Sequence, residues 1–214
     1  MEMGTGKSKV LIDTIGILYG KGAINAVVIV APKGVYRNWS TKEIPDHLPE
    51  YVDRHVAVWS PAPRKQEKTD LVKLFHTDLD KLKIFIINVE AFSTAKGVKF
   101  TENFILGHQV LFAVDESTTI KNPKASRTKA ITKLAKNTKY RRILTGSPIT
   151  QSPLDLYSQT EVLETNLLGY TSYYSFQNHY GEVVNRYFGG RTVRQVVGYR
   201  NLDELSQKLD SFSY

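Results

Sequence analysis

Three short apolar runs constrain the fold of this chain more than any other feature. They occupy residues 26–31 (AVVIVA), 84–89 (IFIINV) and 110–114 (VLFAV), and turn-forming or charged residues flank them. Runs this short and this rich in β-branched residues are typical of strands buried on both faces, as in a parallel sheet. Residues 55–59 and 142–144 are further, weaker strand candidates.

Helical patterns separate these strands. Apolar spacing predicts helices over residues 7–19 and 64–75, a helix over 35–44 that stops at Pro45, and a basic helix over 124–135. Residues 100–106 fit either a short helix or a loop. Strands that alternate with helices predict an α/β fold, with a mostly parallel sheet covered by helices on both faces.

The texture of the sequence changes after residue 150. A helix is expected over 154–163, aromatic residues crowd 170–187, and a last helix is expected over 202–209. Gly189 and Gly190 suit the turn of a hairpin between 185–188 and 193–197. We therefore expect a lobe over 1–150, and a helical and aromatic extension over 151–214 that packs on the same lobe. The tyrosines of 170–187 suit packing, or a platform on which bases stack.

The first eight residues, MEMGTGKS, have the pattern of a phosphate-binding loop that runs into a helix. The glycines let backbone N–H groups approach a phosphate, and the helix directs its positive end at the same place. Lys7 suits the β- and γ-phosphates, and the Ser8 hydroxyl suits Mg²⁺. The leading position is Met1 where the usual pattern has glycine, so a glycine-rich turn that caps a helix is the alternative.

Two adjacent carboxylates, Asp115 and Glu116, follow the apolar run 110–114. Ligands of open α/β sheets bind at the carboxyl ends of the strands. A nucleotide site needs one carboxylate for the metal and a group that orients the attacking water. Asp115 suits the first task and Glu116 the second, whereas an isolated acidic pair would only cap a turn.

Composition narrows the choice of partner. Among 214 residues, Lys and Arg number 29 and Asp and Glu 21, a net charge of +8. This excess suits a polyanion such as nucleic acid. The chain has no cysteine, which excludes disulfides and thiolate zinc sites. Neither a membrane span nor a signal peptide is apparent in the sequence, so we expect no membrane partner and a cytoplasmic location.

The order of the motifs resembles the first motor lobe of superfamily-two helicases, and more narrowly the Swi/Snf-type branch with its phage members. The motifs are MGTGKS, VIVAPKGVYRNW, VDESTTIKNP and ILTGSPI. In that branch the P-loop typically reads DEMGxGKT, the Walker B stretch DExxxIKN and motif III LTGTPI. The text after motif III, LDLYSQTEVLETNLLGYTSYYSFQNHY, is also similar, so the resemblance covers nearly all of the chain.

The resemblance implies a RecA-like P-loop NTPase lobe that uses ATP and Mg²⁺. Lys7, Asp115 and Glu116 would be catalytic, and Ser8 and Asp115 would hold the metal. The phosphates would lie against Gly4, Thr5, Gly6, Lys7 and Ser8, and the groups that couple the nucleotide site to nucleic acid would be Thr145, Gly146 and Ser147.

The resemblance also implies contacts to a strand backbone, made by Lys33 and Asn38 near motif Ia and by Asn88 and Ser93 near motif Ib. Lys121 and Arg127 belong to a basic turn and helix beside the acidic pair. That helix suits a nucleic-acid contact or a solvated face.

The sequence also departs from the Swi/Snf-type pattern at several points. Ser117 and Thr118 stand where Ala-His or Gly-His is usual, so the histidine contact to motif III is missing. Neither the strand before the P-loop, nor an adenine-reading glutamine, nor the second RecA-like lobe with its arginine finger lies in this sequence. We therefore expect a fragment, half of a motor.

The function expected is that of an ATP-binding lobe in a helicase-like translocase on double-stranded DNA, inactive as an isolated chain. If the gene is a phage gene, the location is the host cytoplasm. Two alternatives are a non-catalytic nucleic-acid-binding or interaction module that keeps the fold, and the motor part of a restriction enzyme.

Overall fold

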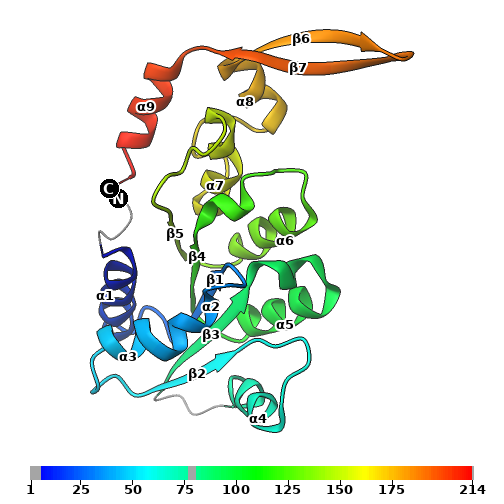
Figure 1. The fold of residues 1–214 in the computed structure, drawn as a ribbon. Coiled ribbons are helices and arrows are strands. Elements are labelled where there is room, and N and C mark those ends of the chain that lie inside the picture. Colours follow the sequence, from blue (N-terminus) through cyan, green and yellow to red (C-terminus); the bar gives the residue numbers. More distant parts are fainter. Residues whose placement is uncertain (1–5, 77–80, 214) are drawn as a thin grey trace.

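A five-stranded parallel sheet organises the chain (Figure 1). The computed structural model describes residues 6–76 and 81–213. The strand order is β2-β3-β1-β4-β5, and every neighbouring pair is parallel. The strands are β1 (Ala26–Ala31), β2 (Arg54–Val58), β3 (Leu82–Asn88), β4 (Val110–Asp115) and β5 (Tyr140–Leu144).

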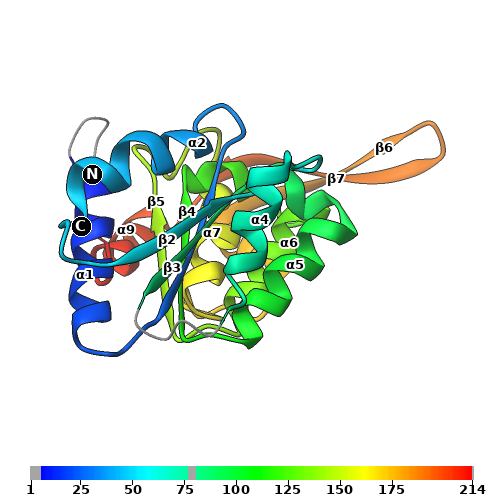
Figure 2. The same ribbon diagram turned by 90° about the horizontal axis from the view of Figure 1, so that it is seen from below.

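Alternate residues of the central strands face two separate cores. Val28 and Val30 join the core under α4 (Lys65–Lys73), α5 (Ala95–Leu106) and α6 (Ser126–Ala135). Val27 and Ile29 join the core under α1 (Lys7–Gly20), α2 (Tyr36–Asn38), η1 (Trp39–Glu43) and α3 (Ile44–His47). Figure 2 shows the two helix groups on opposite faces of the sheet. The predicted α/β fold is therefore confirmed.

The helix expected to stop at Pro45 instead continues through it to His47. A proline inside a helix lacks the N–H that would bond four residues back, and its ring clashes with that carbonyl. The π-turn of η1 comes directly before α3 and changes the hydrogen-bond spacing locally. Pro45 also falls in the first turn of α3, where a missing N–H costs little.

The segment left open between helix and loop is helical. It belongs to α5, which begins at Ala95. Thr94 caps this helix, because its side-chain hydroxyl accepts a hydrogen bond from the Gly97 N–H. The 3₁₀ turn η2 (Val89–Ser93) connects β3 to this helix.

Beyond β5 the chain forms η4 (Pro153–Asp155), α7 (Leu156–Leu163) and α8 (Tyr173–Tyr180). Helix α7 packs on α6 and β5, and its Val162 belongs to the core of the sheet. Helix α8 was not predicted. It joins a third apolar cluster that includes Leu154, Leu168, Phe176, Tyr180 and Leu205. The division at residue 150 stays a prediction.

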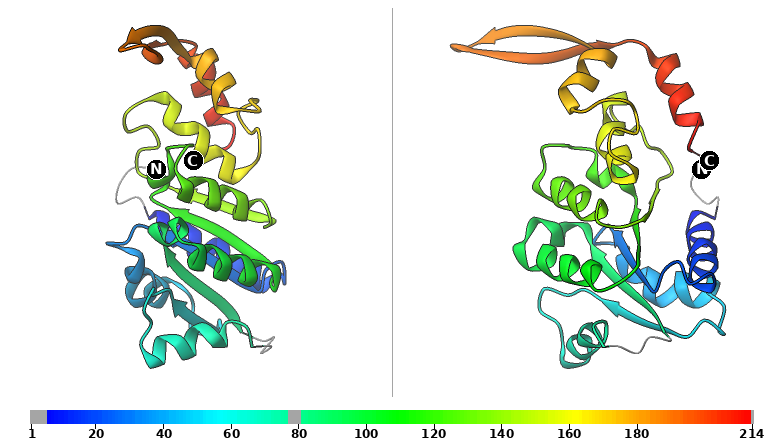
Figure 3. Two further views of the ribbon diagram at one scale, coloured as in Figure 1. Left: turned by 90° about the vertical axis from the view of Figure 1, so that its right-hand side faces the viewer. Right: turned by 180° about the vertical axis from the view of Figure 1, so that it is seen from behind.

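A two-stranded antiparallel hairpin extends from the rest of the molecule (Figures 1 and 3). It comprises β6 (Gly181–Phe188) and β7 (Arg191–Tyr199), longer than the sequence predicts, and α9 (Leu202–Asp210) follows it. Gly189 and Gly190 form its turn, both with positive φ. Its base is anchored on α8, where Arg200 donates to the carbonyl of Asn178.

Within the two described ranges, no helix combines the length and the apolar character that crossing a membrane requires.

Candidate functional site

The start of α1 carries the last residues of the predicted phosphate loop. Gly6 caps the helix with φ 78°, a left-handed conformation that favours glycine. Lys7 and Ser8 are the first two helical residues, both half-buried. The helix therefore presents an N-terminal turn with a lysine and a hydroxyl, as the loop pattern predicts. Gly4 and Thr5 lie outside the described residues.

Asp115 is the last residue of β4, and its carboxylate is held by two donors. The indole Nε1 of Trp39 donates to Oδ2 at 3.0 Å, and the backbone N–H of Glu116 donates to Oδ1 at 3.0 Å. Burial raises the pKa of Asp115 above its usual range, although both hydrogen bonds and the charge of Lys7 oppose this rise. Lys7 therefore lies within electrostatic reach of Asp115, which brings the two predicted sites together.

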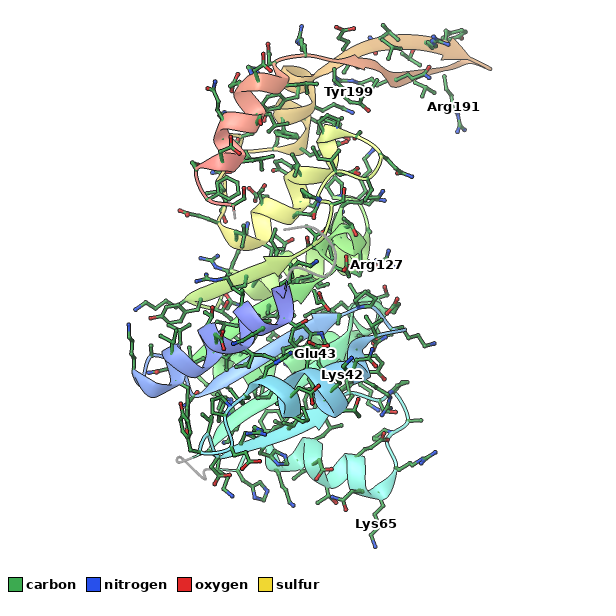
Figure 4. All side chains as sticks on the ribbon, turned by 60° about the vertical axis from the view of Figure 1, so that its left-hand side comes forward. Lys42, Glu43, Lys65, Arg127, Arg191 and Tyr199 are labelled. Carbon is green, nitrogen blue, oxygen red and sulfur yellow. The ribbon has the colours of Figure 1, made fainter. Side chains whose placement is uncertain are left out.

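A second carboxylate acts on the same group. The charge of Glu43 adds to the rise in the pKa of Asp115. Figure 4 labels Glu43 on η1, the π-turn that also supplies Trp39. A cation bound at Asp115 would offset both the cost of burying its negative charge and the repulsion from Glu43.

Glu116 has an unusual backbone. Its φ is 47° and its ψ 60°, left-handed values that cost a residue other than glycine about 1–3 kcal/mol. The chain turns here from β4 into the 3₁₀ turn η3 (Ser117–Ile120), so the strained residue is the one expected to orient water.

Because all five strands are parallel, their carboxyl ends meet at one edge of the sheet. Lys33 follows β1 by two residues and is exposed, Asn88 ends β3, and Thr145 follows β5. Asn88 is 9% exposed, and its amide donates to Glu90 at 3.1 Å. The structure thus brings residues of four predicted motifs to one edge.

The remaining predicted contacts lie nearby on helices and turns. Asn38 ends α2 and Ser93 ends η2, and both are exposed. Arg127, labelled in Figure 4, lies in the first turn of α6, and its buried Nε has no hydrogen-bond partner among residues 6–76 and 81–213. Lys121 forms an ion pair with Asp155 at 3.6 Å.

A buried amide links the acidic pair to the 145–147 segment. Ser117 Oγ donates to Gln159 Oε1 at 2.6 Å, and Gln159 Nε2 donates to the Pro148 carbonyl at 2.7 Å. Gly146 and Ser147 lie directly before Pro148, and Ser147 is exposed.

Two residues of the site, Trp39 and Gln159, were not among the predicted site residues. Trp39 is 2% exposed and packs in the core, and its indole N–H also reaches Asp115. A tryptophan whose N–H must find a partner when buried was the available signal. Gln159 offered no comparable signal, because its neighbours Ser158, Thr160 and Glu161 are polar as well.

The donors near Asp115 suit a hard cation. Carboxylate and hydroxyl oxygens are ligands of Mg²⁺, which usually takes one or two protein groups and completes its shell with water and phosphate. In the part of the chain that the structure describes, no group of three His, Asp or Glu side chains forms a metal site by itself. Asp115 and Ser8 stay the predicted ligands of a metal.

Comparisons with known proteins agree with this architecture. Residues 1–211 match the family model of the SNF2-related domain. The chain is 28% identical over 208 residues to the human and bovine proteins named DNA annealing helicase and endonuclease ZRANB3. It is 23% identical over 223 residues to a Drosophila melanogaster homolog of the transcriptional regulator ATRX. Each match includes 97% of this chain but only 16–18% of the relative's length.

Solved structures show the same fold. The SWI2/SNF2 ATPase core of Sulfolobus solfataricus in complex with dsDNA superposes with a TM-score of 0.60 at 23% identity. The match includes 84% of this chain and 33% of that one. A second structure of that core gives 0.59 at 25% identity. These relatives are animal and archaeal, and the phage branch stays a prediction.

Proposed function

We propose that this chain, which belongs to the SNF2-related domain family, is the ATP-binding lobe of a DNA-dependent ATPase that moves along double-stranded DNA. The observation that carries the proposal is the convergence on Asp115. Its carboxylate lies at a strand end, within electrostatic reach of Lys7, and is oriented by Trp39 and by the backbone of Glu116.

The chemistry assigned to these residues is positioning and charge stabilisation. Lys7 and the N–H groups at the start of α1 would bind the nucleotide phosphates. Ser8 and Asp115 would hold Mg²⁺, which neutralises charge on the phosphate oxygens when it is bound. Glu116 would orient and deprotonate the attacking water.

DNA would lie across the carboxyl edge of the sheet. Lys33, Asn38 and Ser93 are exposed there and can contact a phosphate backbone without reading bases. Thr145, Gly146 and Ser147 connect this edge to the nucleotide site. The Sulfolobus relative, solved in complex with dsDNA, supports the choice of a duplex.

A binding experiment tests the nucleotide site directly. Lys7→Ala should weaken nucleotide binding at least several-fold, because it removes the charge that faces the phosphates. Lys9→Ala is the matched control, since Lys9 is exposed and pairs with Asp13 on the same helix at 2.7 Å. Equal affinities for the two variants would remove the phosphate-loop assignment.

A second comparison tests the need for a further lobe. Because the chain spans 33% of the Sulfolobus core, we propose that it shows almost no DNA-stimulated phosphate release alone, and that a protein spanning a whole core releases phosphate. An arginine supplied by the rest of such a core would account for about 10³–10⁵ in rate. Robust stimulation of the chain by itself would contradict this division.

A further inference from the structure

We propose that Gln159 is a positioning residue that couples the acidic pair to the 145–147 segment. The inference rests on the proposed function, because it assigns a role within that ATPase cycle. The residue lies on α7 and contacts neither nucleotide nor DNA in the proposed arrangement. It would act through Ser117 on one side and Pro148 on the other.

The geometry of the amide permits only one arrangement. Its oxygen accepts from Ser117 Oγ at 2.6 Å, while its nitrogen donates to the carbonyls of Pro148 at 2.7 Å and Asp155 at 2.9 Å. The reversed amide would place its oxygen against two carbonyl oxygens, which donate nothing. Ser117 and Gln159 are both fully buried, so water does not compete for these contacts.

Each end of the bridge adjoins a residue with a proposed role. Ser117 directly follows Glu116, whose left-handed backbone leaves few alternative conformations. Ser117 therefore connects Glu116 to α7, and a movement of the 145–147 segment on DNA binding would reach Glu116 through this hydrogen bond. At the other end, Pro148 directly follows Ser147, so the same amide senses the position of the coupling segment.

A second set of contacts binds the same two segments to the start of α7. Asp155 Oδ2 accepts from the N–H of Gln151 at 2.9 Å and from the Thr150 hydroxyl at 2.9 Å. Lys121 donates to that hydroxyl at 2.7 Å, and Ser158 donates to the Lys121 carbonyl at 3.2 Å. The start of α7 is thereby attached to both segments at several points.

A packing role alone does not require an amide at this position. Leucine has a similar volume, and burying a polar group is unfavourable unless its hydrogen bonds are made. Residues 147–150 are exposed, so their position depends on hydrogen bonds such as those from Gln159 to Pro148 and from Thr150 to Asp155. Gln159 links η3 to this segment through two hydrogen bonds that a leucine cannot make.

The test measures ATP hydrolysis, with and without duplex DNA, by a protein that contains this chain and spans a whole two-lobed ATPase core. Gln159→Leu should leave the KM for ATP and the DNA-free rate within about twofold, and lower the DNA-stimulated kcat about tenfold. Ser117→Ala should have the same effect to a smaller extent. The double variant should be no worse than Gln159→Leu, because both changes break one connection.

Thr160→Val is the matched control. Thr160 lies next to Gln159 on α7 and is 3% exposed, and its hydroxyl donates to the backbone carbonyls of Leu156 at 3.1 Å and Tyr157 at 3.0 Å. Its loss should lower thermal stability without changing the stimulation by DNA. The proposal is overturned if Gln159→Leu keeps the wild-type stimulation by DNA, or if it lowers the rates with and without DNA by the same factor. A wild-type protein without DNA-stimulated hydrolysis would instead refute the proposed function, and the coupling with it.

Discussion

The indole N–H of Trp39 donates a 3.0 Å hydrogen bond to the carboxylate of Asp115, although the two residues are 76 positions apart in the chain. One lies on the π-turn η1 and the other ends β4. The segment that follows β1 therefore sets the direction of the carboxylate that ends β4. The predicted motif Ia and Walker B regions are in direct contact.

Trp39→Phe should separate this hydrogen bond from packing. The free energy of unfolding should fall by about 1–3 kcal/mol, and hydrolysis should need more Mg²⁺, because Asp115 loses a donor that orients it. Trp59→Phe is the control, since Trp59 is 3% exposed and lies in the core on the other face of the sheet. Identical Mg²⁺ titrations for the two variants would show that the indole N–H does not matter for the metal.

The two carboxylates should fail in different ways. Glu116→Gln should keep ATP and Mg²⁺ binding while hydrolysis falls by roughly 10²-fold or more, because the water loses its base. Asp115→Asn should instead weaken the binding of Mg²⁺, and so change how binding and turnover depend on the Mg²⁺ concentration. Both are measured in a protein with both lobes, by Mg²⁺ titration of binding and of turnover. Variants that behave alike would contradict this division of roles.

Lys33 should contribute one phosphate contact. DNA affinity should fall steeply with salt, and Lys33→Ala should reduce the log–log slope by about 0.9 for duplex DNA. Lys21→Ala serves as the control, because Lys21 is exposed at the end of α1, near the opposite edge of the sheet. A slope unchanged by Lys33→Ala would remove this residue from the interface.

The carboxylate of Asp155 should make the free energy of unfolding depend on pH. Burial alone would raise its pKa, but hydrogen bonds from Gln151, Thr150 and Ser152 outweigh this and hold the pKa below its usual range. A carboxylate with a lowered pKa in the folded state stabilises above the unfolded pKa, about 3.9, and loses this contribution as the pH falls through the folded value. Asp155→Asn should thus be less stable at pH 7, and the gap to wild type should narrow below about pH 4.

Urea unfolding at several pH values measures this gap. Asp13→Asn is the control, because Asp13 is exposed and its ion pair with Lys9 contributes little. A gap for Asp155→Asn that stays constant with pH would mean that the charge of Asp155 is not what stabilises the turn.

The sequence predicted the sheet well because local signals there agree with the fold. The run 26–31 has the exact bounds of β1, since a strand buried on both faces must be apolar throughout. Pro45 misled the prediction because the π-turn that accommodates it leaves no mark in a helical pattern. Helix α8 was missed because its Tyr, Phe, Asn and His residues have modest helix propensity, and the third apolar cluster stabilises it instead.

The site was predicted in part for the same reason. Residues at strand ends follow from the apolar runs, so Asp115 and Thr145 were expected at one edge. The hydrogen bonds from Trp39 to Asp115 and from Ser117 to Gln159 join residues 76 and 42 positions apart, and no periodicity in the sequence predicts such a pairing.

The β6–β7 hairpin should unfold locally before the rest of the molecule does. Its base is fixed by Arg200, which donates to the carbonyl of Asn178, and by Val196, which packs on the third apolar cluster. Farther out, Tyr187 is 74% and Val193 47% exposed, so little buried surface holds the outer half. Its amides should exchange with deuterium far sooner than those of β1, and trypsin should cleave at Arg191 while the lobe stays folded. The hairpin is thus a separate cooperative unit that can be lost and regained without unfolding the sheet.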